Sequence, residues 1–110
     1  MKICVPVTPD GQVDPRWGRA QHVAVASVSG GRLDGWEVFD VGWGTLHDQG
    51  PEGTHHARVA RFLQEHAVEL VVADHMGPGM AQMLAKMGIT VRLGAGGPAR
   101  DAVVAGTTLH

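Results

Sequence analysis

The side chains best suited to bind a ligand are histidines and an aspartate that lie next to predicted secondary structure. Asp74 and His75 stand where an apolar run over residues 68–74 ends, the position at which a buried strand should finish. His55 and His56 open a segment with helical spacing. Neutral imidazole is a good ligand for iron, zinc, copper or nickel. We therefore predict that His55, His56 and His75 bind a metal.

The geometry of a helix limits how these side chains can act together. Adjacent residues in a helix point about 100° apart, so His55 and His56 cannot face one metal ion from a regular helix. One should point toward the sheet edge and the other toward the preceding loop, where His47 lies. Three roles stay open for Asp74: a metal ligand, a partner that fixes an imidazole tautomer, or a cap for the helix after Gly77.

The other histidines and the single cysteine are predicted to play lesser parts. Three histidines are expected to be polar surface residues (His47, His66 and His110), and one to be structural (His22). Cys4 lies within the first predicted strand and is expected to be a buried small hydrophobe. A thiolate ligand from Cys4, or an imidazole ligand from His47, stays open.

Glycines are concentrated in two predicted strand-to-helix turns. Gly77 and Gly79 remove side chains, so that backbone N–H groups of the next helix could approach an anion closely. The segment 94–99, with Gly96 and Gly97, repeats this arrangement at the following strand end. Side by side, the two turns would form a positively polarised floor for an anionic cluster, a phosphate or a carboxylate. Tight turns without a ligand are the alternative.

Methionines and tryptophans have simpler explanations. Four methionines form one helical stripe, which is predicted to be core packing rather than a Cu(I) site: Met76, Met80, Met83 and Met87. Trp17 and Trp43 flank loops near the predicted site and could shield a cofactor from water. Surface packing is the simpler expectation for both tryptophans.

Bulk composition predicts one globular domain spanning residues 1–110. Hydrophobic residues make up 44% of the chain and charged residues 18%, which is typical of folded rather than disordered proteins. The formal net charge of −2 and the absence of a basic run argue against nucleic acid binding. One cysteine excludes an internal disulfide and a four-cysteine metal site.

The location predicted from the sequence is the cytoplasm. Pro6 and Pro9 interrupt the region where a signal peptide would need an apolar run. Nowhere does an apolar run approach the roughly 20 residues that a membrane span requires. No membrane partner is therefore expected.

The elements that must position the site follow from periodicity and turn residues. Strands are predicted over 2–7, 22–28, 36–41, 68–74 and 89–94, helices over 54–67, 78–88 and 98–106, a turn over 29–35 and a loop over 42–53. Thr54 is expected to cap the first helix, and Gly88 and Gly106 to end the later two.

This order predicts an α/β fold with a mixed five-stranded sheet and helices on both faces. The first three strands should be antiparallel, whereas each later strand follows a helix and should run parallel through a right-handed crossover. That arrangement is a ribonuclease H-like architecture. In such sheets, ligands bind beyond the carboxyl ends of the parallel strands, where helix N-termini converge.

Four segments resemble the dinitrogenase iron-molybdenum cofactor biosynthesis family, whose members are small ribonuclease H-like domains. They are "MKICVPV", "RWGRAQHVAVASV", "VELVVADHMGPGM" and "MGITVRLGAGGPARDAV", and they run essentially from end to end of the chain. The family motif His-Phe-Gly-Arg-Ala is similar to the second segment. This chain departs from that motif, because Arg16 stands where the family has a histidine.

The resemblance implies binding, carriage or storage of an iron-sulfur or iron-molybdenum cluster, as in nitrogen fixation, without catalysis. It also implies that Arg19 anchors an anionic cluster and that a cofactor-receiving protein is a partner. An alternative is a regulatory or interaction domain that binds a small anion. A two-metal nuclease is disfavoured, because "KICVPV" carries no acid on the first strand.

Overall fold

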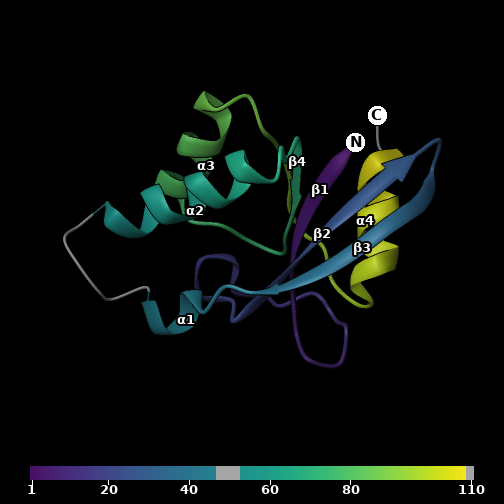
Figure 1. Cartoon of the computed structure of the whole chain (residues 1–110), viewed down its shortest axis with the longest axis horizontal. Helices are drawn as coiled ribbons and strands as arrows, with labels where there is room; N and C mark the ends of the chain where they lie inside the picture. The colour runs from purple at the N-terminus through teal and green to yellow at the C-terminus, as the bar shows by residue number, and fades with distance from the viewer. Residues whose placement is uncertain (47–52, 109–110) are drawn as a thin grey trace.

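The computed structural model describes residues 1–46 and 53–108. In chain order its elements are β1 (Lys2–Val7), the 3₁₀ turn η1 (Trp17–Arg19), β2 (His22–Ser29), β3 (Arg32–Asp40), α1 (Trp43–Leu46), α2 (Thr54–Glu65), β4 (Leu70–Val72), α3 (Pro78–Lys86), β5 (Thr90–Arg92) and α4 (Ala99–Thr108) (Figure 1). No helix in these two ranges is long and apolar enough to cross a membrane.

The five strands form one mixed sheet in the order β3-β2-β1-β4-β5. Strand β2 pairs antiparallel with both β1 and β3. Strand β4 pairs parallel with both β1 and β5. The predicted mixed five-stranded sheet is therefore confirmed, whereas its classification as ribonuclease H-like stays a prediction.

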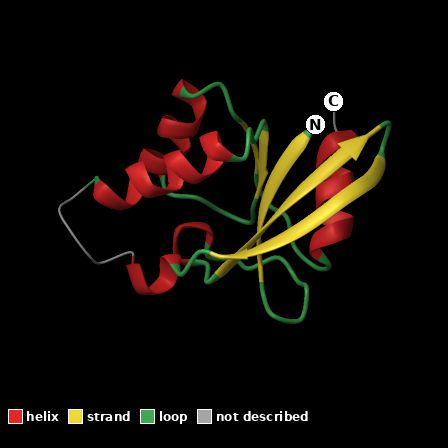
Figure 2. Ribbon diagram, in the orientation of Figure 1, coloured by secondary structure: helices red, strands yellow, loops and turns green. Residues whose placement is uncertain are grey.

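Helices cover both faces of the sheet, as predicted (Figure 2). On one face, Val59 of α2 and Leu84 of α3 pack in a core cluster that includes Cys4. On the other face, Val103 of α4 packs with Ile3 and other strand residues. The four methionines of the predicted stripe belong to or pack against the first cluster, which confirms their role in the core.

The hairpin between β2 and β3 is tighter than predicted. Its turn is only Gly30 and Gly31, with φ of +57° and +77°, rather than the predicted seven residues 29–35. Two consecutive glycines tolerate these positive φ values and close a two-residue hairpin turn that matches strand twist. Residues 32–35 therefore belong to β3, and the predicted strand start at residue 36 is wrong.

The predicted loop 42–53 begins with the short helix α1 rather than irregular structure. The indole of Trp43 is 1% exposed and that of Trp17 is 2% exposed, so the expectation that both pack on the surface is wrong. Their ring centroids lie 5.3 Å apart at an interplanar angle of 70°. A Cβ at Gly44 would lie 2.7 Å from the carbonyl oxygen of Arg19, so α1 packs directly against η1.

Two predicted helix boundaries are also wrong. Gly53, with φ of 90°, is the N-cap of α2, and Thr54 lies inside the helix. Gly106 lies within α4 instead of ending it. Gly88, with φ of +77°, follows α3 as predicted. The predictions for His47 and His110 concern positions outside the described residues.

Gly106 is needed for close packing of α4 on the sheet. A Cβ there would lie 2.9 Å from Cγ2 of Val72, a contact that must be relieved by movement. Overpacking costs about 1–3 kcal/mol, and alanine regains about 1 kcal/mol of helix propensity. We expect Gly106→Ala to lower the free energy of unfolding by about 1 kcal/mol in urea denaturation. Ala85→Gly, at an exposed site in α3, measures propensity alone; a stabilising Gly106→Ala would contradict this packing.

Candidate functional site

A pocket of about 310 Å³ lies where three segments distant in sequence meet. Its walls come from residues 16–19 of the η1 turn, from His55 and His56 at the start of α2, and from residues of the segment 75–80. The last segment connects β4 to α3. The pocket therefore lies beside the carboxyl end of a parallel strand, where the predicted topology expected a ligand.

The η1 segment is held in place by Asp14, a residue that sequence analysis missed. Its carboxylate is 4% exposed and accepts hydrogen bonds from the backbone N–H of Arg16 at 2.9 Å and from Arg16 Nε at 3.3 Å. The backbone of Arg16 also forms an isolated parallel bridge with His75. An aspartate that bonds the backbone two residues onward is a recognisable turn pattern. The sequence Asp14-Pro15-Arg16 therefore carried a usable signal.

His55 is 8% exposed, and both of its ring nitrogens have hydrogen-bond partners. Nε2 lies 2.7 Å from the carbonyl oxygen of Gly18, and Nδ1 lies 3.0 Å from Nη1 of Arg58. Because a guanidinium only donates, Nδ1 must accept and Nε2–H must donate. His55 therefore braces the pocket wall. Its predicted role as a metal ligand would require one of these bonds to break.

The other two predicted metal ligands, His56 and His75, are exposed and line the same pocket. A Cβ at Gly79 would lie 3.3 Å from Cε1 of His56, so a glycine lets this ring lie against the start of α3. Within residues 1–46 and 53–108, no three His, Cys, Asp or Glu side chains are grouped to hold a metal ion. The pocket thus presents two imidazoles rather than a three-ligand metal site.

The start of α3 contributes residues with uncapped backbone N–H groups to the pocket lining. Gly77 is its N-cap in an extended conformation and Pro78 follows, and no side chain caps this end. First-turn N–H groups have no partner within a helix, so those of Gly79 and Met80 are available to a ligand. Asp74 is exposed, lies outside the pocket lining and does not cap α3, so the cap, one of the three roles open to it, is wrong.

Trp17 contributes a donor that lacks an acceptor. Its Nε1–H is buried and has no hydrogen-bond partner in the described part of the chain. Leaving a buried donor unsatisfied costs about 1–3 kcal/mol. Trp17 lines the pocket, but Nε1 itself is buried, so a bound group could reach this donor only if the indole moved.

Charge in the pocket has one sign. Arg16 and Arg19 are exposed cations in its lining, which includes no acidic side chain among the described residues, and the charge of Arg16 is partly offset by the Asp14 carboxylate, which lies 3.3 Å from its Nε outside the lining. This contrasts with the formal net charge of −2 of the whole chain. Cys4 plays no part, because it is fully buried and burial raises the pKa of its thiol far above the usual range. The pocket is therefore suited to an anion.

The second predicted glycine turn does not join this site. Gly97 accepts a hydrogen bond from the backbone N–H of Val13, and Gly96 lines a different pocket of about 270 Å³ beside α4. The predicted common glycine floor therefore does not form. The physical reason is that α3 and α4 cover opposite faces of the sheet, which sends their preceding turns apart.

Comparison with known proteins adds to this geometry. The chain matches the family described as "Dinitrogenase iron-molybdenum cofactor" over residues 1–107. No curated protein matches significantly.

Three solved structures are similar in fold. The crystal structure of PH0822 has a TM-score of 0.75 at 21% identity, covering 96% of this chain and 90% of that chain. The apo form of the orange protein from Desulfovibrio gigas has a TM-score of 0.72 at 26% identity, covering 93% and 82%. A putative NifB protein from Thermotoga, assigned to the DUF35 family and solved by NMR, has a TM-score of 0.67 at 23% identity, covering 96% and 86%.

Proposed function

Because this chain belongs to the dinitrogenase iron-molybdenum cofactor family, we propose that it binds and carries an anionic iron-sulfur or iron-molybdenum cluster in the pocket between η1, α2 and α3. The cluster is cargo, and the protein catalyses no reaction on it. A cofactor-receiving protein takes the cargo, and the exchange takes place in the cytoplasm. The strand order 3-2-1-4-5 supports the further proposal that the fold is ribonuclease H-like.

The observation that carries this proposal is the concentration of donors and positive charge in one pocket without an acid. Arg19 and the first-turn amides of α3, which belong to residues that line the pocket, can donate to an anionic sulfide or oxide surface. His56 and His75 add two imidazoles that can bind a cluster metal.

The same pocket is better suited to carrying a cluster transiently than to holding it permanently. A structural metal site encloses its ion with four protein ligands, whereas this open pocket offers two exposed imidazoles among its described residues. Hydrogen bonds and charge can hold a preassembled cluster and release it intact to a partner. The alternative cargo is a small oxyanion, because the amides and arginines would bind one equally well.

The test is anaerobic reconstitution of the purified chain with ferrous iron and sulfide, with and without molybdate. We expect a coloured protein with a charge-transfer absorption and co-elution of iron, or iron and molybdenum, through gel filtration. Sulfate and phosphate serve as competitors, since a small-oxyanion protein would bind these and take up no iron. A chain that elutes without metal under all of these conditions would contradict the proposal.

A further inference from the structure

The outer face of α2 carries a second pocket of about 370 Å³. It shares no lining residue with the pocket between η1, α2 and α3, which we call the cargo pocket. Helical spacing places residues 54, 57, 58, 61 and 65 on this face, and Phe62 completes the lining. We call the surface formed by these six residues the α2 notch; its cations are Arg58 and Arg61, and its aromatic ring is that of Phe62. The proposed function makes no use of it.

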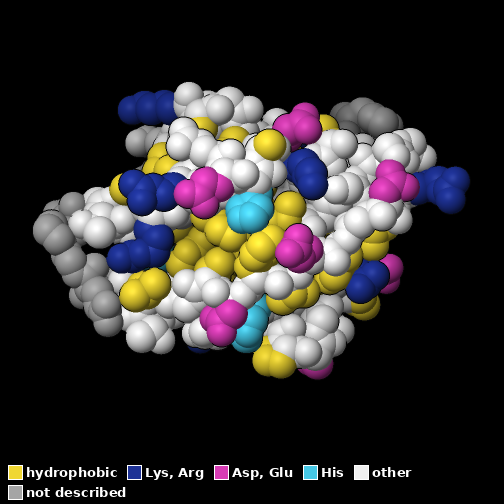
Figure 3. Space-filling view, viewed as in Figure 1, with side chains coloured by type: hydrophobic (Ala, Val, Ile, Leu, Met, Phe, Trp, Pro, Cys, Tyr) yellow, Lys and Arg dark blue, Asp and Glu magenta, His cyan; other side chains and the backbone are white. Residues whose placement is uncertain are grey.

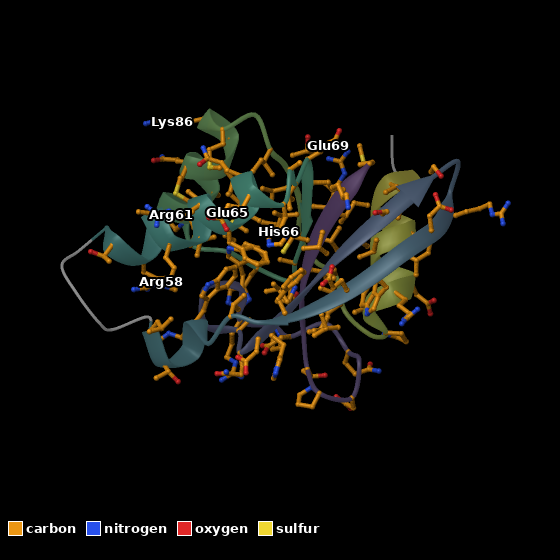
Figure 4. The ribbon with its side chains drawn as sticks, viewed as in Figure 1. Arg58, Arg61, Glu65, His66, Glu69 and Lys86 are labelled. Carbon is orange, nitrogen blue, oxygen red and sulfur yellow. The ribbon has the colours of Figure 1, made fainter. Side chains whose placement is uncertain are left out.

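The α2 notch is positively charged on a chain that is negative overall. Figure 4 places Arg58, Arg61 and Lys86 along one side of the molecule, with Glu65 and His66 nearer the sheet. Arg61 is exposed and has no ion-pair partner within the described residues. Glu65 is the one acidic side chain in the notch lining that the structure describes. This excess of cations favours a partner that carries carboxylates.

An apolar surface lies next to these cations. Phe62 is partly buried and its ring lies 5.8 Å from Trp43, 5.5 Å from Phe39 and 4.4 Å from His66, measured between ring centroids. Figure 3 shows dark-blue Lys and Arg side chains, together with magenta Asp and Glu side chains, bordering a yellow hydrophobic patch on this face. A guanidinium pair beside an aromatic ring can bind acidic and apolar side chains of one segment together.

Arg58 joins the α2 notch to the cargo pocket. Its Nη1 lies 3.0 Å from Nδ1 of His55 and 3.3 Å from the carbonyl oxygen of Leu46. The opposite ring nitrogen of His55 contacts Gly18 in the pocket wall. Nη1 is one of three guanidinium nitrogens, and a carboxylate that binds Nε and Nη2 from outside can draw the guanidinium away from the imidazole. Docking at the α2 notch would therefore loosen the brace of the pocket wall.

We propose that the α2 notch is a docking site for an acidic, partly apolar segment of a partner protein, and that Arg58 and His55 link docking to the cargo pocket. The docking site stands on its own observations. The link rests on the proposed function, because it assumes that the pocket holds cargo.

The probe is a short acetylated peptide that alternates glutamate with leucine, titrated into the full chain and followed by calorimetry and by ¹H–¹⁵N NMR. We expect it to shift the amide signals of residues 54–65 and the ring ¹⁵N signals of His55. Arg61→Gln should weaken binding roughly tenfold or more through loss of a charged donor. Arg32→Gln, which removes the same charge at the exposed start of β3, should leave binding unchanged.

Several results would overturn the docking site: no binding of the glutamate peptide, equal binding of its glutamine version, or equal affinity for Arg61→Gln. A single-stranded RNA that competes equally with the peptide would also overturn it, by marking a general polyanion surface. Ring signals of His55 that stay unmoved during docking would overturn the link.

Cluster uptake of Arg61→Gln separates this inference from the proposed function. The variant lies outside the cargo pocket and should take up cluster as the native chain does. Normal uptake without peptide binding in the native chain would overturn the docking site alone. Peptide binding without uptake would overturn the proposed function and the link, and would leave the docking site standing.

Discussion

Replacing both His56 and His75 with alanine should weaken cluster binding by roughly a hundredfold or more, because each lost interaction with an anionic or metal group is worth about 1.5–3 kcal/mol. Both side chains are exposed and line the pocket, so their removal should change the free energy of unfolding by less than about 0.5 kcal/mol. The measurements are metal content per chain after gel filtration, the dissociation constant from absorbance titration, and the unfolding midpoint.

The matched control is His66→Ala. This imidazole lies near the end of α2 outside the pocket, with its ring centroid 4.5 Å from that of Phe39. The His66→Ala variant should have the same metal content as the native chain. If the double variant retains as much metal as the native chain while His66→Ala loses it, the pocket assigned to the cargo is the wrong one.

The largest loss of stability is expected for Trp43→Ala. Truncating a buried aromatic side chain costs about 3–5 kcal/mol, out of a total of about 5–15 kcal/mol for a typical domain. Trp43 is 1% exposed, and its ring packs against those of Trp17, Phe62 and His55. Its loss would leave a cavity behind the pocket wall. Urea denaturation followed by circular dichroism measures the change, and cluster binding should weaken in parallel.

Trp36→Ala provides the comparison within the same chain. Trp36 is only partly buried, and the guanidinium of Arg100 lies 4.9 Å from its ring centroid. An exposed cation–π contact contributes about 0.5–1 kcal/mol, so the cost should be well below that of Trp43→Ala. Equal costs for the two variants would show that α1 is not an integral part of the core.

Much of the fold could be predicted from the sequence because it depends on local patterns. The apolar run in β1, the alternation in β2 and the helical spacing in α2 and α3 each report which face is buried. The order of strands and helices then leaves few topologies, since parallel crossovers are right-handed. Predicted helix boundaries were less accurate where one residue type can serve two structural purposes. Glycine ends a helix after α3, yet Gly106 inside α4 serves close packing.

The candidate site was predicted in part for the same reason. Topology indicated that the start of α2 and the β4–α3 turn should meet, and the family resemblance pointed to Arg19. Seven predicted residues line the pocket there: Trp17, Arg19, His55, His56, His75, Gly77 and Gly79. Asp74, Gly96 and Gly97 do not line it. Gly96 and Gly97 follow β5, and the next helix, α4, lies on the other face of the sheet. The spacing of residues along the chain does not encode which face a helix covers.

By itself, the sequence determined the order of the five strands and the three longer helices, the sheet type and the family, because these follow from periodicity and from motifs that are contiguous in the chain. Only the tertiary structure decided which groups the described histidines contact. The type and position of His55 predicted a metal ligand, yet its ring nitrogens bond Gly18 and Arg58. Gly18 lies 37 residues away in the chain. The role of a side chain depends on its partners in space, and those partners are set by how the whole sheet brings distant segments together.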